Sequence, residues 1–222
     1  MDWIDGLKLK RREEVLIYTA ITLVSIGFVN IKSFNTILNA YAAYLLVLII
    51  LPLYLLKRSG TSLLTAFGIE RKRLSYLYLF LLIMIGVSSM LVYRPSLYPV
   101  AIFSFVLAPV AEETSFRGYI VTRLKPSGKL LAVIYSGAAF GLAHFFVDTS
   151  FEAAALRFVL GILLAYIFVV SGKLLAAISL HVVFNVYTIL HVYSSIQSYI
   201  ALLCSFLLVV LALYEYYSAR RT

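Results

Sequence analysis

Cysteine, histidine and charged residues are all scarce in this chain of 222 residues. The single cysteine, Cys204, excludes an intrachain disulfide and a cysteine-based metal site. Charged residues make up only 13% of the chain, whereas a soluble globular protein contains about 25%. Together with a hydrophobic share of 63%, this composition excludes an ordinary soluble domain and predicts a polytopic membrane protein.

Acidic residues are outnumbered by basic ones, 10 against 19, which gives a net charge of +9. The basic residues lie mostly between apolar stretches, where they match anionic lipid headgroups better than a nucleic acid. We therefore expect the lipid bilayer to be a partner, and we expect no binding to nucleic acid.

Eight apolar stretches are long enough to cross a bilayer, which takes about 20 residues as a helix. They lie at about residues 14–31, 37–56, 75–93, 97–121, 130–147, 153–171, 174–192 and 196–215. The sequence therefore predicts an all-α fold, a bundle of about eight transmembrane helices. Residues 1–222 are expected to form a single integral-membrane domain.

The basic residues are distributed unevenly between the two ends of these helices. The N-terminal tail carries four, the connection 57–74 carries five, and the connection after the fourth stretch carries three. The opposite side has only Lys32 and Arg94. By the positive-inside rule, we expect a multi-pass protein of the cell membrane with both termini in the cytoplasm.

Six polar residues interrupt the apolar stretches in three short groups. They are Glu112, Glu113 and Arg117, then His144 in a Phe-x-x-x-His motif, and then His181 and Asn185 in a His-x-x-x-Asn motif. A charged side chain at the centre of a bilayer costs about 2.5–3.5 kcal/mol on insertion scales, so such residues mark functional sites. A rise of 1.5 Å per residue puts all three groups roughly 12–22 Å from the inner boundary. This shared depth predicts one site.

The two adjacent glutamates are expected to play different parts. Glu113 and Arg117 are four residues apart with the acid first, which is the favourable order for a helical ion pair. Glu112 points about 100° away around the helix, so it can face a cavity and act as a general base on water. Pro109 is expected to bend this span. The alternative is a purely structural Glu-Glu-Arg network between helices.

His144 follows Gly137-x-x-x-Gly141, small residues that allow close helix contact. That contact could bring His144 against the helix of Glu112. His144 could then orient a water molecule with Glu112, ligate a metal, or serve as a buried structural histidine.

His181 and Asn185 share one face of their helix because they are four residues apart. Imidazole and carboxamide N–H groups are typical oxyanion-hole donors, while hydrogen bonding between helices is the structural alternative. Arg157 is expected to extend outward to the membrane surface.

The need for a metal is left open by these residues. Glu112, His144 and His181 could form a zinc site of two histidines and one carboxylate. The His-Glu-x-x-His helix of zinc proteases is absent from the sequence. A water activated by Glu112 and His144 needs no metal, so we expect no cofactor and keep Zn²⁺ as the alternative.

Together, the three motifs resemble those of the CPBP family, the CAAX proteases and bacteriocin-processing enzymes, also called type II CAAX prenyl endopeptidases or the Abi family. The resemblance rests on Glu112-Glu113-Thr-Ser-Phe116-Arg117-Gly118, Phe140-x-x-x-His144 and His181-x-x-x-Asn185, in that order. It covers about residues 105–190 and implies an intramembrane protease of eight helices, with its catalytic core at about residues 97–192.

The resemblance also implies a role for each motif residue. Glu112 would be the general base, and His144 would share the water. Glu113 and Arg117 would support them. His181 and Asn185 would form the oxyanion hole.

The expected function is therefore that of an intramembrane endopeptidase acting on membrane-associated proteins or peptides. The resemblance leaves open whether the substrate is prenylated. One alternative is a non-proteolytic family member that acts as a membrane binding protein or a bacteriocin self-immunity protein. A proton-coupled transporter would also need membrane carboxylates, but the broken, pseudo-symmetric helices of such a protein are not evident.

Overall fold

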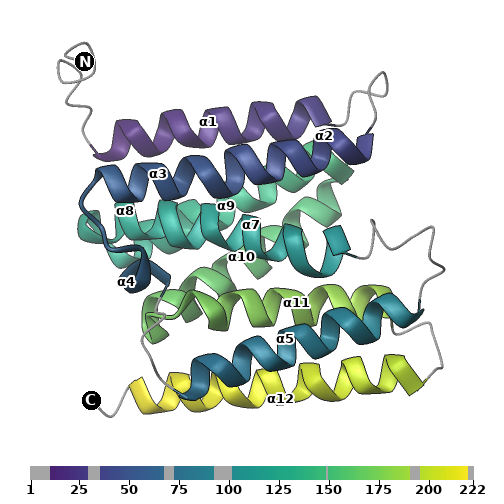
Figure 1. The fold of residues 1–222 in the computed structure, drawn as a ribbon. Coiled ribbons are helices and arrows are strands. Elements are labelled where there is room, and N and C mark those ends of the chain that lie inside the picture. The colour runs from purple at the N-terminus through teal and green to yellow at the C-terminus, as the bar shows by residue number, and fades with distance from the viewer. Residues whose placement is uncertain are drawn as a thin grey trace.

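Helices account for almost all of the chain that the structure describes. The computed structural model describes residues 11–29, 36–67, 73–92, 102–148, 150–190 and 196–219. Within these ranges there is no β-strand, and only short turns interrupt the helices (Figure 1). The predicted all-α fold is therefore confirmed.

The helices follow the apolar stretches of the sequence. The α-helices are α1 (Arg11–Val29), α2 (Thr36–Ala43), α3 (Leu51–Arg58), α4 (Leu63–Phe67), α5 (Arg73–Val92), α7 (Ala108–Glu113), α8 (Thr122–Leu124), α9 (Lys129–Asp148), α10 (Phe151–Ser171), α11 (Leu174–Leu190) and α12 (Ile196–Ala219). Wider π-helical turns form η1 (Tyr44–Ile50), η3 (Phe103–Leu107) and η4 (Thr114–Val121), and a 3₁₀ turn forms η5 (Lys125–Ser127). The π-helical turns join their neighbours end to end, so α2–η1–α3 and η3–α7–η4–α8 are continuous rods.

The long helices lie side by side in one bundle (Figure 1). α1 and the α2–η1–α3 rod lie along one edge, and α5 and α12 pack together along the opposite edge. The rod from η3 to α8 runs between them and contacts α9, α10 and α11. α1 begins and α12 ends on the same side of the bundle, as an even number of crossings requires. The count of eight spans and the cytoplasmic placement of the termini stay predictions.

Three helices in the described part of the chain are long and apolar enough to cross a membrane. They are Asn39–Arg58, Lys129–Val147 and Phe151–Ser171, and a shorter apolar helix covers Leu174–Tyr187. Large apolar side chains are exposed along the three, for example Leu46, Ile134 and Leu163. Such surfaces suit lipid better than water, so the chain is a helical membrane protein.

Two of the π-helical turns end two residues before a proline. Pro52 lies at the start of α3, after η1, and Pro109 lies at the start of α7, after η3. Proline has no N–H, and its ring clashes with the carbonyl four residues earlier. The preceding turn therefore widens to i→i+5 hydrogen bonding and the rod continues unbroken. The bend expected at Pro109 takes the form of this widened turn, just before Glu112.

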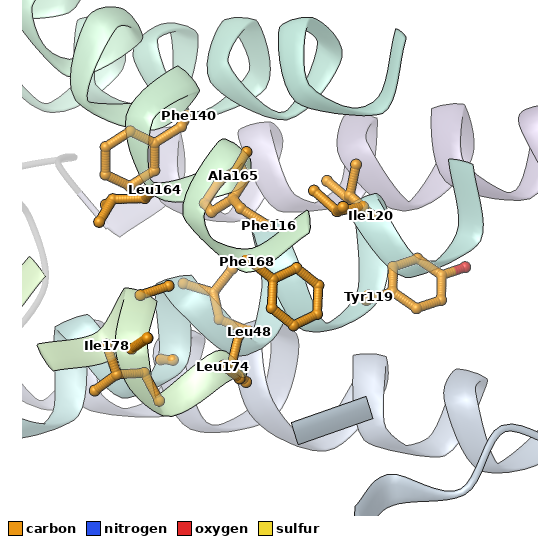
Figure 2. Packing of buried hydrophobic residues seen from close by; sticks show 14 of the residues in the cluster. Leu48, Phe116, Tyr119, Ile120, Phe140, Leu164, Ala165, Phe168, Leu174 and Ile178 are labelled. Atoms are coloured by element: carbon orange, nitrogen blue, oxygen red, sulfur yellow. The ribbon is translucent and has the colours of Figure 1, made fainter. Parts of the chain in front are cut away.

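The most deeply buried part of the bundle is the rod that carries the glutamates. Every residue of η4 is buried, and so are five of the six residues of α7. The core around this rod includes Phe116, Phe140, Leu164, Phe168 and Leu174 (Figure 2). Polar side chains enclosed by such a core must make their hydrogen bonds mainly to one another.

A glycine contact fixes α9 against α10. A Cβ added at Gly137 would lie 2.7 Å from Cγ1 of Ile162, and one added at Gly141 would lie 2.9 Å from the backbone oxygen of Ala154. Gly161 of α10 completes the contact, because a Cβ there would lie 2.9 Å from Cα of Gly137. The predicted close contact is present, but the expected partner is wrong. The glycines face α10, which also has a small residue at the crossing, and not the helix of Glu112.

Candidate active site

Glu112 lies inside the bundle with one carboxylate oxygen bonded and the other open. Oε1 accepts a hydrogen bond of 2.9 Å from the hydroxyl of Tyr44, the first residue of η1. Oε2 is buried and has no hydrogen-bond partner among the residues that the structure describes. It lies 3.6 Å from Nε2 of His181 and 4.0 Å from Nε2 of His144. Residues from α7, α9 and α11 therefore meet at this oxygen.

Glu113 and Arg117 form the contact predicted from their spacing. Nη1 of Arg117 donates to Oε1 of Glu113 at 3.0 Å, and both side chains are fully buried. Nη2 donates to the backbone oxygen of Gly161 at 3.0 Å. The guanidinium also lies over the ring of Phe140, 4.6 Å from its centroid. Because a buried charge without a partner is strongly destabilising, these contacts hold η4 against α9 and α10.

His181 connects the two glutamates. Its Nδ1 lies 2.8 Å from Oε1 of Glu113 and donates to it, because an ionised carboxylate oxygen can only accept. This hydrogen bond orients the ring so that Nε2 faces Glu112. In the neutral imidazole, Nε2 then carries a lone pair. His181 can therefore donate from Nε2 to a reacting oxygen only when the ring holds a second proton.

His144 is oriented in the same way by a backbone carbonyl. Its Nδ1 lies 3.0 Å from the oxygen of Phe140, one turn earlier, and a carbonyl oxygen can only accept. Nε2 is then the lone-pair nitrogen of the neutral ring, and it faces Glu112. Both imidazoles thus present Nε2 to the same carboxylate oxygen.

Phe140 gives a physical reason for the aromatic residue in the Phe-x-x-x-His motif. Its ring centroid lies 4.5 Å from that of His144 and 5.6 Å from that of His181. The same ring lies under the guanidinium of Arg117 and stands edge-on to Phe116. An aromatic face attracts a cation and packs against imidazole without taking part in their hydrogen bonds. Phe140 therefore positions three polar side chains and leaves their N–H groups available.

Asn185 completes the set of residues predicted from the sequence. It lies on α11 one turn beyond His181 and is half-buried. Its spacing from His181 places it on the same helix face, at the edge of the buried cluster.

Two residues around the cluster were not predicted for it. Tyr44 reaches Glu112 across 68 residues of sequence, and no local pattern separates it from the other members of a set of 17 tyrosines. The guanidinium of Arg157, which was expected to extend outward to the membrane surface, lies over the ring of Phe184 on α11, 4.9 Å from the centroid. An aromatic face attracts a cation, so this contact with another helix fixes where the side chain lies.

Counting its fully buried groups alone, and not the half-buried Arg157, the cluster carries one net negative charge when both glutamates are ionised. Glu112 and Glu113 bring two negative charges when both are ionised, and Arg117 brings one positive charge. A net charge in a buried site is unfavourable. One proton held among Glu112, His144 and His181 restores neutrality. The arrangement therefore suits a reaction in which a single proton moves.

Whether the protein uses zinc stays a prediction to be tested. In the described part of the chain, no group of three or more His, Cys, Asp or Glu side chains is placed to hold a metal ion. Glu112, His144 and His181 nevertheless converge, with Nε2 of His181 at 3.6 Å and Nε2 of His144 at 4.0 Å from Oε2 of Glu112. No step proposed below passes through a metal.

The fold and this cluster define a helical membrane protein with a buried carboxylate–imidazole centre. Residues 94–187 match the Rce1-like family model, described as type II CAAX prenyl endopeptidase Rce1-like. This segment contains all three motifs, and over these residues the chain is similar to the CPBP or CAAX protease family. No curated protein and no solved structure matches the chain.

Proposed function

We propose that this protein is an intramembrane endopeptidase that hydrolyses peptide bonds of membrane-associated substrates. The observation that carries the proposal is the open Oε2 of Glu112, which faces Nε2 of both His144 and His181. A buried carboxylate oxygen without a hydrogen-bond partner needs one from outside the protein, and a water molecule is suitable. The family match supports peptide hydrolysis as the class of reaction.

Glu112 is the general base in this proposal. Its Oε2 takes a proton from the water, and the lone pair on Nε2 of His144 orients the second hydrogen of that water. The resulting hydroxide adds to the carbonyl carbon of the scissile bond, and Glu112 passes its proton to the leaving amine. The hydrogen bond from Tyr44 holds Oε1, so that Oε2 is the oxygen free to react.

His181 and Asn185 stabilise the oxyanion that forms in the same step. The carboxamide of Asn185 donates to it directly, and His181 donates from Nε2 when it holds the shared proton. Glu113 and Arg117 are positioning residues. Glu113 orients His181 at Nδ1, and Arg117 neutralises Glu113, so neither needs to touch the substrate.

The cellular setting forms part of the proposal. We propose a multi-pass protein of the cell membrane with both termini in the cytoplasm, acting on a membrane-associated protein or peptide without a bound metal. Whether a prenyl group is required is decided by comparing otherwise identical substrates with and without it. The family description names prenyl endopeptidases, which makes a prenylated peptide the first substrate to test.

The test is cleavage by the purified protein reconstituted in lipid. It is offered a farnesylated CaaX peptide and a library of membrane peptides, with and without a chelator. Glu112→Gln keeps the shape of the side chain but removes the base, so cleavage should fall by about 10² or more. Glu13→Gln changes an exposed glutamate in the first turn of α1 and should leave cleavage unchanged.

Three outcomes would change the account. Full cleavage by Glu112→Gln refutes the proposed mechanism. Loss of activity with chelator, restored by Zn²⁺, shows that a metal is needed. If wild-type protein cleaves nothing and Glu112→Gln abolishes a bacteriocin-immunity phenotype, the non-proteolytic alternative replaces the endopeptidase.

A further inference from the structure

A second arginine, Arg157, lies near the site on α10. Arg157 belongs to α10, six residues after Phe151, in a helix long and apolar enough to cross a membrane. It is half-buried and packs over Phe184. Among the residues that the structure describes, no carboxylate and no hydrogen-bond acceptor pairs with this guanidinium. Glu152, on the same helix, instead accepts a hydrogen bond from Ser150.

Helix packing brings the Arg157 side chain to the level of His144. α9 and α10 run antiparallel, and the close contacts of Gly141 with Ala154 and Phe158 place Arg157 level with Gly141. Side chains on a helix tilt toward its N-terminus, so the long arginine side chain extends from there toward His144.

On its other side, Arg157 packs against α11, the helix that carries the proposed oxyanion residues. Phe184, the aromatic partner of its guanidinium, directly precedes Asn185 and lies one turn from His181 on α11. The guanidinium therefore lies between the α9 side and the α11 side of the cluster. A peptide whose scissile bond reaches Glu112 would pass close to it.

We infer that Arg157 binds a carboxylate of the peptide substrate and so determines which peptides are cleaved. The inference rests on the proposed endopeptidase function. A guanidinium presents two parallel N–H donors that match the two oxygens of a carboxylate, and such a pair is strong where water is excluded. The contact with the ring of Phe184 orients the guanidinium before a substrate binds. The carboxylate is either the C-terminus of the peptide or an acidic side chain near the scissile bond.

The position of Arg157 favours a peptide over a lipid headgroup. Headgroup phosphates bind basic side chains at the membrane surface, beside the ends of helices. The Cα of Arg157 lies about 9 Å along α10 from its first residue at 1.5 Å per residue, and the guanidinium packs against Phe184 of α11. A carboxylate bound there lies beside the helix that carries His181 and Asn185.

The first test measures binding in a Glu112→Gln background, where the peptide is not consumed. The probe is a fluorescein-labelled farnesylated CaaX peptide, made with a free C-terminal carboxylate, as the C-terminal amide, and with each acidic side chain replaced by its amide. One of the neutralised peptides should bind about tenfold more weakly than the peptide that keeps all its carboxylates. The carboxylate missing from that peptide is the one that Arg157 binds. Arg157→Gln should remove this difference, and Arg157→Lys should retain part of it. Arg58→Gln, at an exposed position at the end of α3, is the control and should retain the full difference in binding between the charged and the neutralised peptide.

The second test compares cleavage of the same peptides. Arg157→Gln should lower kcat/KM about tenfold for the charged peptide and leave the neutralised peptide unchanged. An equal loss for both peptides, or an unchanged preference, overturns the inference. A dependence on anionic lipid that Arg157→Gln removes, with no dependence on peptide charge, assigns Arg157 to headgroups and overturns it too. If the wild-type protein cleaves no peptide, the endopeptidase proposal fails, while the binding test still decides the role of Arg157.

Discussion

The paired region around Glu113 and the open region around Glu112 are adjacent in the sequence but differ in their contacts. Oε1 of Glu113 accepts from both Arg117 and His181, and all three side chains are buried. Its Oε2 is unbonded, but Arg117 neutralises the charge. Glu112 is held only at Oε1, by Tyr44, and directs Oε2 at two imidazoles. One helical turn thus contains a carboxylate that stabilises the bundle and another that can react.

Removing Arg117 should have the largest effect, because it breaks the paired region. Arg117→Ala leaves Glu113 buried without its cation, a change that destabilises by about 3–5 kcal/mol. Folded yield and activity should therefore fall together. Yield is measured by size-exclusion chromatography in detergent and activity by peptide cleavage. Arg58→Ala, at an exposed arginine, is the control, and a well-folded Arg117→Ala protein would show that the pair is dispensable.

Removing Asn185 should affect catalysis in the open region around Glu112 and leave the paired region around Glu113 intact. Asn185→Ala deletes one proposed oxyanion donor at a half-buried position, so kcat should fall by about 10²–10³. KM and the unfolding temperature should change little, because the donor acts on the transition state. Steady-state kinetics with a validated peptide separate the two constants. A rise in KM with unchanged kcat would instead assign Asn185 to substrate binding.

Removing the Tyr44 hydroxyl should have the smallest effect of the three. Tyr44→Phe keeps the ring but deprives Oε1 of Glu112 of a hydrogen bond to a charged group, worth about 1.5–3 kcal/mol. We expect roughly a tenfold loss in kcat and near-normal folding. Tyr54→Phe, at an exposed tyrosine on α3, is the matched control. Wild-type kinetics for Tyr44→Phe would remove Tyr44 from the site.

Local spacing was enough to predict one part of this structure and not another. The contact between Glu113 and Arg117 follows from an i, i+4 spacing, and the helices follow from apolar stretches of bilayer length. The hydrogen bond from Tyr44 joins residues 68 apart in sequence, and nothing near Tyr44 signals it.

Two further features could not be predicted from the sequence for the same reason. The glycines of α9 indicated a close contact with another helix, and the structure shows that this helix is α10. The sequence of one helix does not indicate which neighbour packs against it. The direction of the Arg157 side chain was predicted from its position near a helix end. In the structure, the ring of Phe184 on another helix determines where the guanidinium lies. Both depend on tertiary packing.

The most direct test of the difference between the two glutamates compares Glu112→Gln with Glu113→Gln. For each variant, the cleavage rate is divided by the amount of folded protein, and the unfolding temperature is measured on the same sample. We predict that Glu112→Gln unfolds close to the wild-type temperature and that its cleavage rate is lower by a factor of about 10² or more. Glu113→Gln should melt at a lower temperature, because Arg117 and His181 lose a charged partner. A stable, inactive Glu113→Gln together with a fully active Glu112→Gln would contradict the account.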